Sequence, residues 1–194
     1  MGKMFSLYIF DMGGVVSRNN DFVTPIASHF GVSVQELYRL AGAEWMRMMV
    51  GNITVDSFWR QLGDKTGHPV AGDLFFTYFH PSPDREVLRL VMKLKANARV
   101  VVGTNTIASH YKVHRHQGDY DTFHTVYASH MMGVAKPEPE FYLKILEAEK
   151  RKPSDTVFVD DTEENVDAAR ALGIHGILFT GSGNLERELM PFMD

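Results

Sequence analysis

Two patterns of apolar and polar residues alternate along the whole chain. Short, continuous apolar runs are typical of strands buried on both faces of a sheet, and amphipathic stretches of helical period lie between them. The runs predict strands at residues 5–10, 98–103, 125–128, 156–160 and 176–180, and the intervals predict helices at residues 84–96, 107–116, 138–150, 163–172 and 184–192. Strands that alternate with helices indicate a parallel sheet covered on both faces, with right-handed crossovers.

One interval is too long for a single helix. A strand–helix–strand unit needs about 30 residues, but the first predicted strand ends at residue 10 and the second begins at residue 98. Helical periods recur within this interval at residues 33–41 and 55–66, and Thr54 is placed to cap the second of these helices. We therefore predict an α/β fold: a Rossmann-like three-layer core of residues 1–14 and 83–194, with a helical cap of residues 15–82 inserted after the first strand.

Composition and charge narrow the function classes. The chain has 194 residues, no cysteine and a net charge of −4. Because it has no long basic run, neither nucleic acid nor an acidic membrane surface is expected as a partner. No apolar stretch approaches the length of about 18 residues that a membrane span requires. The absence of cysteine fits a cytoplasmic protein, and the sequence does not indicate an oligomeric state.

Polar residues follow the predicted strands at the edge where the carboxyl ends of a parallel sheet meet. Ligands of open α/β sheets bind at this edge. Crowded carboxylates there need a cation between them, oxygen ligands suit Mg²⁺, and a lysine suits a phosphate group. The pattern therefore predicts metal-assisted phosphoryl chemistry with a carboxylate nucleophile, Asp11. The residues concerned are Asp11 after the first strand, Thr104 and Asn105 after the second, Lys136 after the third, and Asp160 and Asp161 after the fourth.

The same residues resemble the haloacid dehalogenase superfamily of hydrolases. Four segments carry the resemblance: YIFDMGG at residues 8–14, VVVGTNT at 100–106, GVAKPEPEFY at 133–142 and VFVDDTEENV at 157–166. Within the superfamily, the chain most resembles bacterial sugar-phosphate phosphatases of the alpha-D-glucose-1-phosphate phosphatase type. The resemblance implies that Asp11 forms an aspartyl-phosphate. It also implies phosphate contacts from Thr104, Asn105 and Lys136, and Mg²⁺ held by Asp11, the backbone carbonyl of Gly13, Asp160 and Asp161.

Position 13 departs from the pattern that this resemblance implies. Most phosphatases of the superfamily carry an aspartate two residues after the nucleophile, where it acts as acid and base for the leaving group; here that residue is Gly13. A missing general acid costs roughly 10²–10⁴ in rate. Either the leaving group needs little protonation, or a cap residue or water supplies the proton, or the protein binds phosphate with little turnover.

Three functions follow from these residues. The leading hypothesis is a Mg²⁺-dependent phosphatase of a small phosphorylated metabolite, such as a sugar phosphate. A 2-haloacid dehalogenase would use the same aspartate on carbon without a metal, but the paired acids Asp160 and Asp161 weigh against it. A phosphometabolite-binding protein with little turnover is supported only by Gly13.

Histidines gather between residues 110 and 130, a segment that none of these motifs explains. His110 and His114 have the i, i+4 spacing of a metal pair on a helix. No HExxH pattern accompanies them, so we predict that they belong to a polar surface helix.

Overall fold

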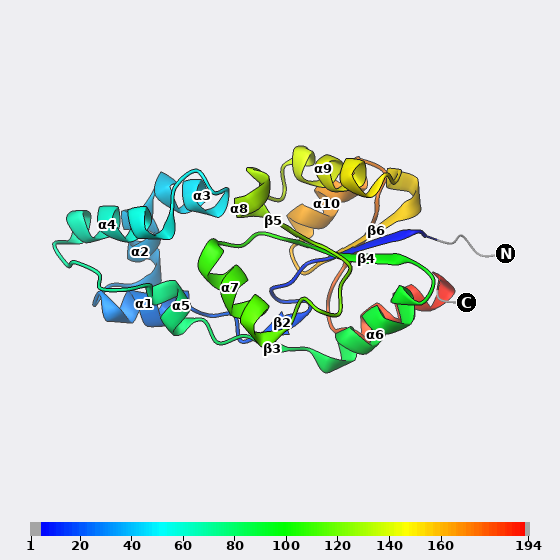
Figure 1. Ribbon diagram of the computed structural model, residues 1–194, viewed down its shortest axis with the longest axis horizontal. Helices are drawn as coiled ribbons and strands as arrows, with labels where there is room; N and C mark the ends of the chain where they lie inside the picture. The colour runs from blue at the N-terminus through cyan, green and yellow to red at the C-terminus, as the bar shows by residue number, and fades with distance from the viewer. Residues whose placement is uncertain (1–4, 193–194) are drawn as a thin grey trace.

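The computed structural model describes residues 5–192. Its main sheet consists of five parallel strands in the order β5–β4–β1–β6–β7 (Figure 1). The five strand predictions and the parallel sheet are confirmed, with ends that differ by only a residue or two. The strands are β1 (Leu7–Phe10), β4 (Arg99–Thr104), β5 (Val126–Ala128), β6 (Thr156–Asp160) and β7 (His175–Leu178).

Helices cover both faces of this sheet. Successive residues of a strand point to opposite faces, so Tyr8 and Phe10 of β1 join one hydrophobic cluster and Leu7 and Ile9 join the other. The central strand is therefore apolar at every position, and the predicted three-layer α/β core is confirmed. The first face is covered by α6 (Arg85–Lys95) and α11 (Ser182–Leu189), and the second by α9 (Pro139–Glu149) and α10 (Glu163–Ala171).

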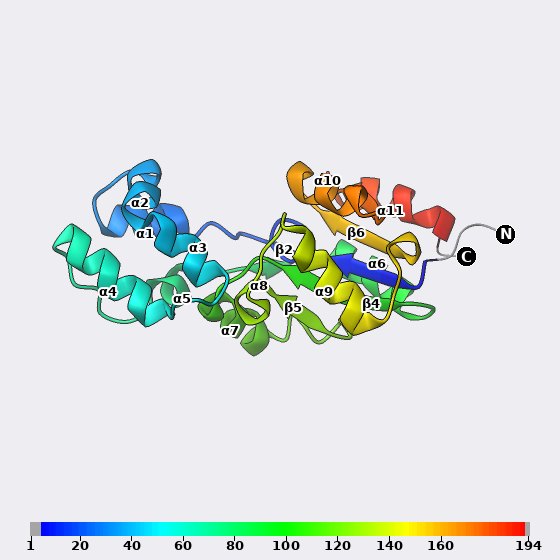
Figure 2. The same ribbon diagram turned by 90° about the horizontal axis from the view of Figure 1, so that it is seen from above.

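A second group of helices lies beyond the carboxyl ends of the strands, at the opposite end of the molecule from α11 (Figures 1 and 2). It has its own aromatic cluster, which includes Phe58, Trp59 and Phe75. The Thr54 side chain accepts a hydrogen bond from the Ser57 N–H at 3.1 Å, so the predicted helix cap is confirmed. The helices are α1 (Val23–His29), α2 (Val34–Ala41), α3 (Ala43–Met49), α4 (Val55–Thr66) and α5 (Leu74–Tyr78).

A small antiparallel pair joins the two groups. Strand β2 (Ser17–Arg18) pairs with β3 (Ser82–Pro83), at the points where the chain leaves the core and returns to it. The sequence pattern did not predict this pair, because two-residue strands have no detectable period. The boundaries that we place at residues 14 and 83 stay a prediction, and residues 1–4 and 193–194 lie outside the described part of the chain.

The remaining helices are short or lie at the margin of the sheet. Helix α7 (Ala108–Gln117) follows β4 and lies between the cap helices and the core (Figure 1). The others are α8 (Ser129–Met132) and the 3₁₀ turns η1 (Pro153–Asp155) and η2 (Met190–Phe192). Within residues 5–192, no helix combines the length and the apolar character needed to cross a membrane.

Candidate active site

The predicted site residues meet at the carboxyl edge of the three central strands. Asp11 directly follows β1, Thr104 ends β4 and Asp160 ends β6, while Lys136 reaches in from the loop after α8. A cavity of about 310 Å³ opens at this edge. Of the predicted residues, Asp160 lies buried beside the cavity without lining it. Those that line it are Asp11, Gly13, Thr104, Asn105, Lys136 and Asp161.

Lys136 is the centre of the charged cluster. Its Nζ lies 2.7 Å from Asp11 Oδ1 and 2.6 Å from Asp160 Oδ2. Its backbone is held by Asn105, whose side-chain amide donates to the Lys136 carbonyl at 2.9 Å and accepts from the Lys136 N–H at 2.8 Å. The amide of Asn105 is thus engaged with the backbone of the lysine loop, and its contribution to the site is to position Lys136.

Burial and mutual charge set the protonation of this cluster. Burial raises the pKa of Asp11 to about 6; Lys136 opposes this shift and Asp160 adds to it. Burial opposes the charge on Lys136, but the carboxylates of Asp11 and Asp160 outweigh it and raise the lysine pKa. Lys136 therefore remains a cation, and Asp11 depends on positive charge nearby to stay ionised.

The acidic residues fit a divalent metal ion. Asp11, Asp160 and Asp161 each offer a carboxylate oxygen, and these oxygens lie within 4.8 Å of one another. Gly14, at φ +79°, makes room for one of them, since a Cβ there would stand 2.0 Å from Asp161 Oδ2. Hard oxygen donors in this number suit Mg²⁺, with further positions left for water and phosphate oxygens.

Asp160 and Asp161 differ in how firmly the fold holds them. Asp160 Oδ1 accepts from the Thr162 N–H at 2.9 Å and from Asn165 Nδ2 at 3.0 Å, while its other oxygen contacts Lys136. Asp161 is exposed and lines the cavity. Burial raises its pKa, and the neighbouring Asp160 adds to that effect. Asp160 is thus the fixed member of the pair, and Asp161 is the one that faces the cavity.

The prediction of a polar surface helix for the histidine segment is wrong for two residues. His110 and His114 are buried, with 6% and 3% exposed, and both line the cavity. The structure also places Asn20, Phe22 and Phe79 of the cap-side segments on the cavity wall. These residues were not predicted from the sequence. Asn20 is held beside the cavity by hydrogen bonds with Ser17, whereas Phe22 and Phe79 are brought there by packing against His110 of α7. The one local signal was the i, i+4 spacing of the two histidines.

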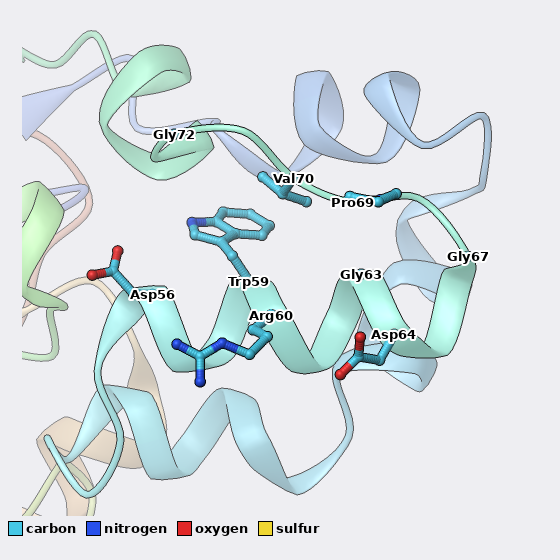
Figure 3. Close-up of a pocket in the computed structure, with 9 residues that line it drawn as sticks. All are labelled: Asp56, Trp59, Arg60, Gly63, Asp64, Gly67, Pro69, Val70 and Gly72. Carbon is cyan, nitrogen blue, oxygen red and sulfur yellow. The ribbon is translucent and has the colours of Figure 1, made fainter.

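A larger cavity, of about 550 Å³, lies within the cap. Figure 3 shows Trp59 rising from α4 towards the loop that carries Pro69 and Val70, with Asp56 and Arg60 on the same helix. This cavity contains none of the predicted site residues. The predicted site residues therefore gather at the smaller cavity and not at the larger one.

Fold and site together indicate a hydrolase with an acidic centre at the carboxyl edge of a parallel sheet. A family model described as haloacid dehalogenase-like hydrolase matches residues 5–173. The chain belongs to this family, as the four sequence segments predicted, and it is an enzyme of the hydrolase class.

Two related phosphatases and one solved structure resemble the chain over most of its length. The chain is 33% identical to a sesquiterpene phosphatase of Aspergillus oryzae over 188 residues, which cover 94% of this chain and 93% of the relative. It is 24% identical to a D-ribitol-5-phosphate phosphatase of Bacteroides thetaiotaomicron, with coverage of 98% and 100%. A family enzyme of the same bacterium, solved with magnesium and inorganic phosphate, shares the fold with a TM-score of 0.77, 24% identity and coverage of 90% and 93%.

Proposed function

We propose that this chain is a Mg²⁺-dependent phosphatase that cleaves a small phosphorylated metabolite through an aspartyl-phosphate on Asp11. One observation carries the proposal: the buried Lys136 ammonium lies 2.7 Å from Asp11 Oδ1, in a cavity that Asp161 also lines. Phosphoryl transfer uses a nucleophile and a fixed positive charge at one place. Asp11 supplies the carboxylate, Lys136 the cation, and Asp161 a further carboxylate at the same edge of the sheet. The two phosphatases among the relatives and the magnesium–phosphate complex of the family enzyme support it.

Each residue of the site has its own role in the proposed catalysis. Asp11 directly follows the buried central strand β1, so its carboxylate has a fixed direction from which to attack phosphorus. Lys136 holds that carboxylate and presents positive charge to the phosphoryl oxygens, and Thr104 offers its hydroxyl from the cavity wall. Bound Mg²⁺, held by Asp11, the Gly13 carbonyl, Asp160 and Asp161, would neutralise charge on the phosphoryl group.

The cavity favours a small organic group on the phosphate. At about 310 Å³ it lies at the lower end of the range for small-molecule sites, about 300–1,000 Å³. Phe22 and Phe79 provide apolar wall, and Asn20 provides a polar group. The named substrates of the two phosphatase relatives differ in polarity, so a panel that spans sugar, polyol and prenyl phosphates is needed.

The test is release of inorganic phosphate from such a panel, measured with Mg²⁺ and with a chelator. Asp11→Asn removes the nucleophile at nearly constant volume. The matched control is Asp167→Asn, since Asp167 lies on the surface of α10 and pairs only with Arg170 among the described ion pairs. We expect Mg²⁺-dependent release that Asp11→Asn abolishes and Asp167→Asn leaves intact.

Two other outcomes would replace this proposal. Metal-independent release of chloride from 2-chloropropionate would indicate a dehalogenase. Saturable binding of phosphate esters by the wild-type protein, without release of phosphate from any of them, would indicate a phosphometabolite-binding protein.

A further inference from the structure

Two histidine side chains line the cavity, and the mechanism proposed above assigns no role to either of them. Of the titratable residues that line it within the described chain, Asp11, Lys136 and Asp161 serve attack and charge neutralisation. Those that remain are His110 and His114, one helical turn apart on α7. Cleavage of an alkyl phosphate also needs a proton for the departing alkoxide, and neither Lys136, committed to two carboxylates, nor Asp11, the nucleophile, is free to supply it.

His114 is held as a proton-transfer residue would be. Its Nδ1 lies 2.7 Å from Asp119 Oδ2, and both side chains are buried. The end of α7 builds this pair: Gly118 takes a left-handed conformation, and the Asp119 N–H donates to the His114 carbonyl at 3.0 Å. A carboxylate at Nδ1 holds the ring in one orientation and leaves Nε2 to exchange a proton.

Two aromatic rings pack against His114. Its ring packs against Phe79 at 5.2 Å and Tyr120 at 5.4 Å, measured between centroids. Burial raises the pKa of Tyr120, and the neighbouring Tyr111, Asp119 and Asp11 add to this shift, in decreasing order. Tyr120 therefore lies within the electrostatic reach of both Asp119 and Asp11.

His110 has different surroundings from His114. Its ring stacks on Phe79 at 3.9 Å and meets Phe22 edge-on at 4.2 Å. Its Nε2 has no hydrogen-bond partner among residues 5–192. Burial, with a smaller effect of His114, lowers the pKa of His110 to about 3. The ring is therefore neutral and unable to carry the proton.

We propose that His114, oriented by Asp119, is the acid and base of this site and takes the place left empty at Gly13. The inference rests on the proposed phosphatase function. As Asp11 Oδ bonds to phosphorus, the ester P–O bond breaks and the departing oxygen takes the proton from His114 Nε2. A water molecule then returns a proton to Nε2 while its oxygen bonds to phosphorus and the aspartyl P–O bond breaks. Phosphate leaves, and Asp11 and protonated His114 are restored.

Leaving-group dependence tests this role. A p-nitrophenolate leaves without a proton, whereas an alkoxide needs one. We would measure kcat/KM for p-nitrophenyl phosphate and for the best alkyl phosphate of the panel, in His114→Gln and Asp119→Asn. The matched control is His116→Gln, the same change at an exposed position of α7. For His114→Gln we expect a loss of roughly 10²–10⁴-fold with the alkyl ester and a much smaller loss with the aryl ester.

The ratio of the two kcat/KM values distinguishes the loss of a proton donor from partial unfolding. A variant that is partly unfolded loses both activities equally, so its ratio stays at the wild-type value. For Asp119→Asn we expect a smaller shift of the ratio in the same direction, and for His116→Gln none.

Three results would overturn the inference. The first is an unchanged ratio in His114→Gln, which would leave the phosphatase function standing. The second is a shift of the ratio in His110→Gln but not in His114→Gln, which would assign the proton to the other imidazole. The third is a wild-type enzyme that cleaves neither ester nor any other member of the panel, which would refute the proposed function itself.

Discussion

Lys136 is the side chain on which the stability of the site depends most, since its ammonium group is the cation between two buried carboxylates. The contacts to Asp11 and Asp160 are 2.7 and 2.6 Å, with 1% of the lysine side chain exposed. Coulomb's law with an effective dielectric constant of about 20 gives roughly 6 kcal/mol for each pair before desolvation. Removing one partner of a buried pair costs about 3–5 kcal/mol, because the remaining charge stays buried.

The substitution Lys136→Met keeps most of the apolar stem of the side chain and removes its ammonium group, with the charge and the hydrogen bond to Asp160. In buffer without Mg²⁺, we expect the free energy of unfolding to fall by about 3–5 kcal/mol, as measured by urea denaturation. The matched control is Lys93→Met. Lys93 is 60% exposed and pairs with Glu186 at 3.2 Å, and loss of such a surface pair costs at most about 1 kcal/mol.

A second substitution separates charge from packing. Asp160→Asn removes one of the stranded charges but keeps an oxygen that accepts from the Thr162 N–H. If unpaired charge is the cause, Lys136→Met with Asp160→Asn will be more stable than Lys136→Met alone, with a coupling of about 0.5–3 kcal/mol. Unpaired charge is not the cause if Lys136→Met costs no more than Lys93→Met, or if the two site substitutions destabilise additively.

Two further predictions concern pH and metal binding. The pKa of His110, about 3 in the fold against 6.5 ordinarily, means that the unfolded chain binds a proton that the folded chain rejects; the stability present above pH 6.5 is therefore lost as pH falls, by about 2 kcal/mol at pH 5. Urea denaturation at pH 8 and at pH 5 measures how much free energy of unfolding each protein loses between these two pH values. His110→Gln should lose about 2 kcal/mol less than the wild type or His116→Gln. Equal losses in the three proteins would contradict a neutral, buried His110. Gly14→Ala places a Cβ 2.0 Å from Asp161 Oδ2 and should weaken Mg²⁺ binding, measured by calorimetry, by roughly 10–100-fold. Gly183→Ala, where a Cβ meets nothing within 4 Å, is its control, and equal affinities in the two variants would count against the metal site.

The parts of the fold that rest on local pattern could be predicted. The strands are apolar at nearly every position because helices cover both faces of the sheet, and that composition is visible without coordinates. Thr54 was identifiable as a helix cap because capping depends only on the three residues that follow it. The carboxyl ends of parallel strands share one edge, so the meeting of Asp11, Thr104 and Asp160 also followed from the order of the elements.

Other features depend on which segments pack together. The amide of Asn105 holds the backbone of Lys136 from 31 residues away, and a residue at a strand end shows no local sign of such a partner. Its predicted phosphate contact stays a prediction, whereas its hold on the lysine loop is seen in the structure.

The α/β class, the parallel sheet and the edge where the predicted site residues meet all depend on spacing along the chain, so they could be read from the residues alone. The burial of the histidines depends instead on contacts between distant segments. A helix as polar as α7 presents no apolar stripe, so its pattern cannot tell which polar residues become covered. His110 and His114 are buried because Phe22 and Phe79 close over one and Asp119 pairs with the other. Burial of a polar side chain is a property of its neighbours in space, and only the folded chain supplies them.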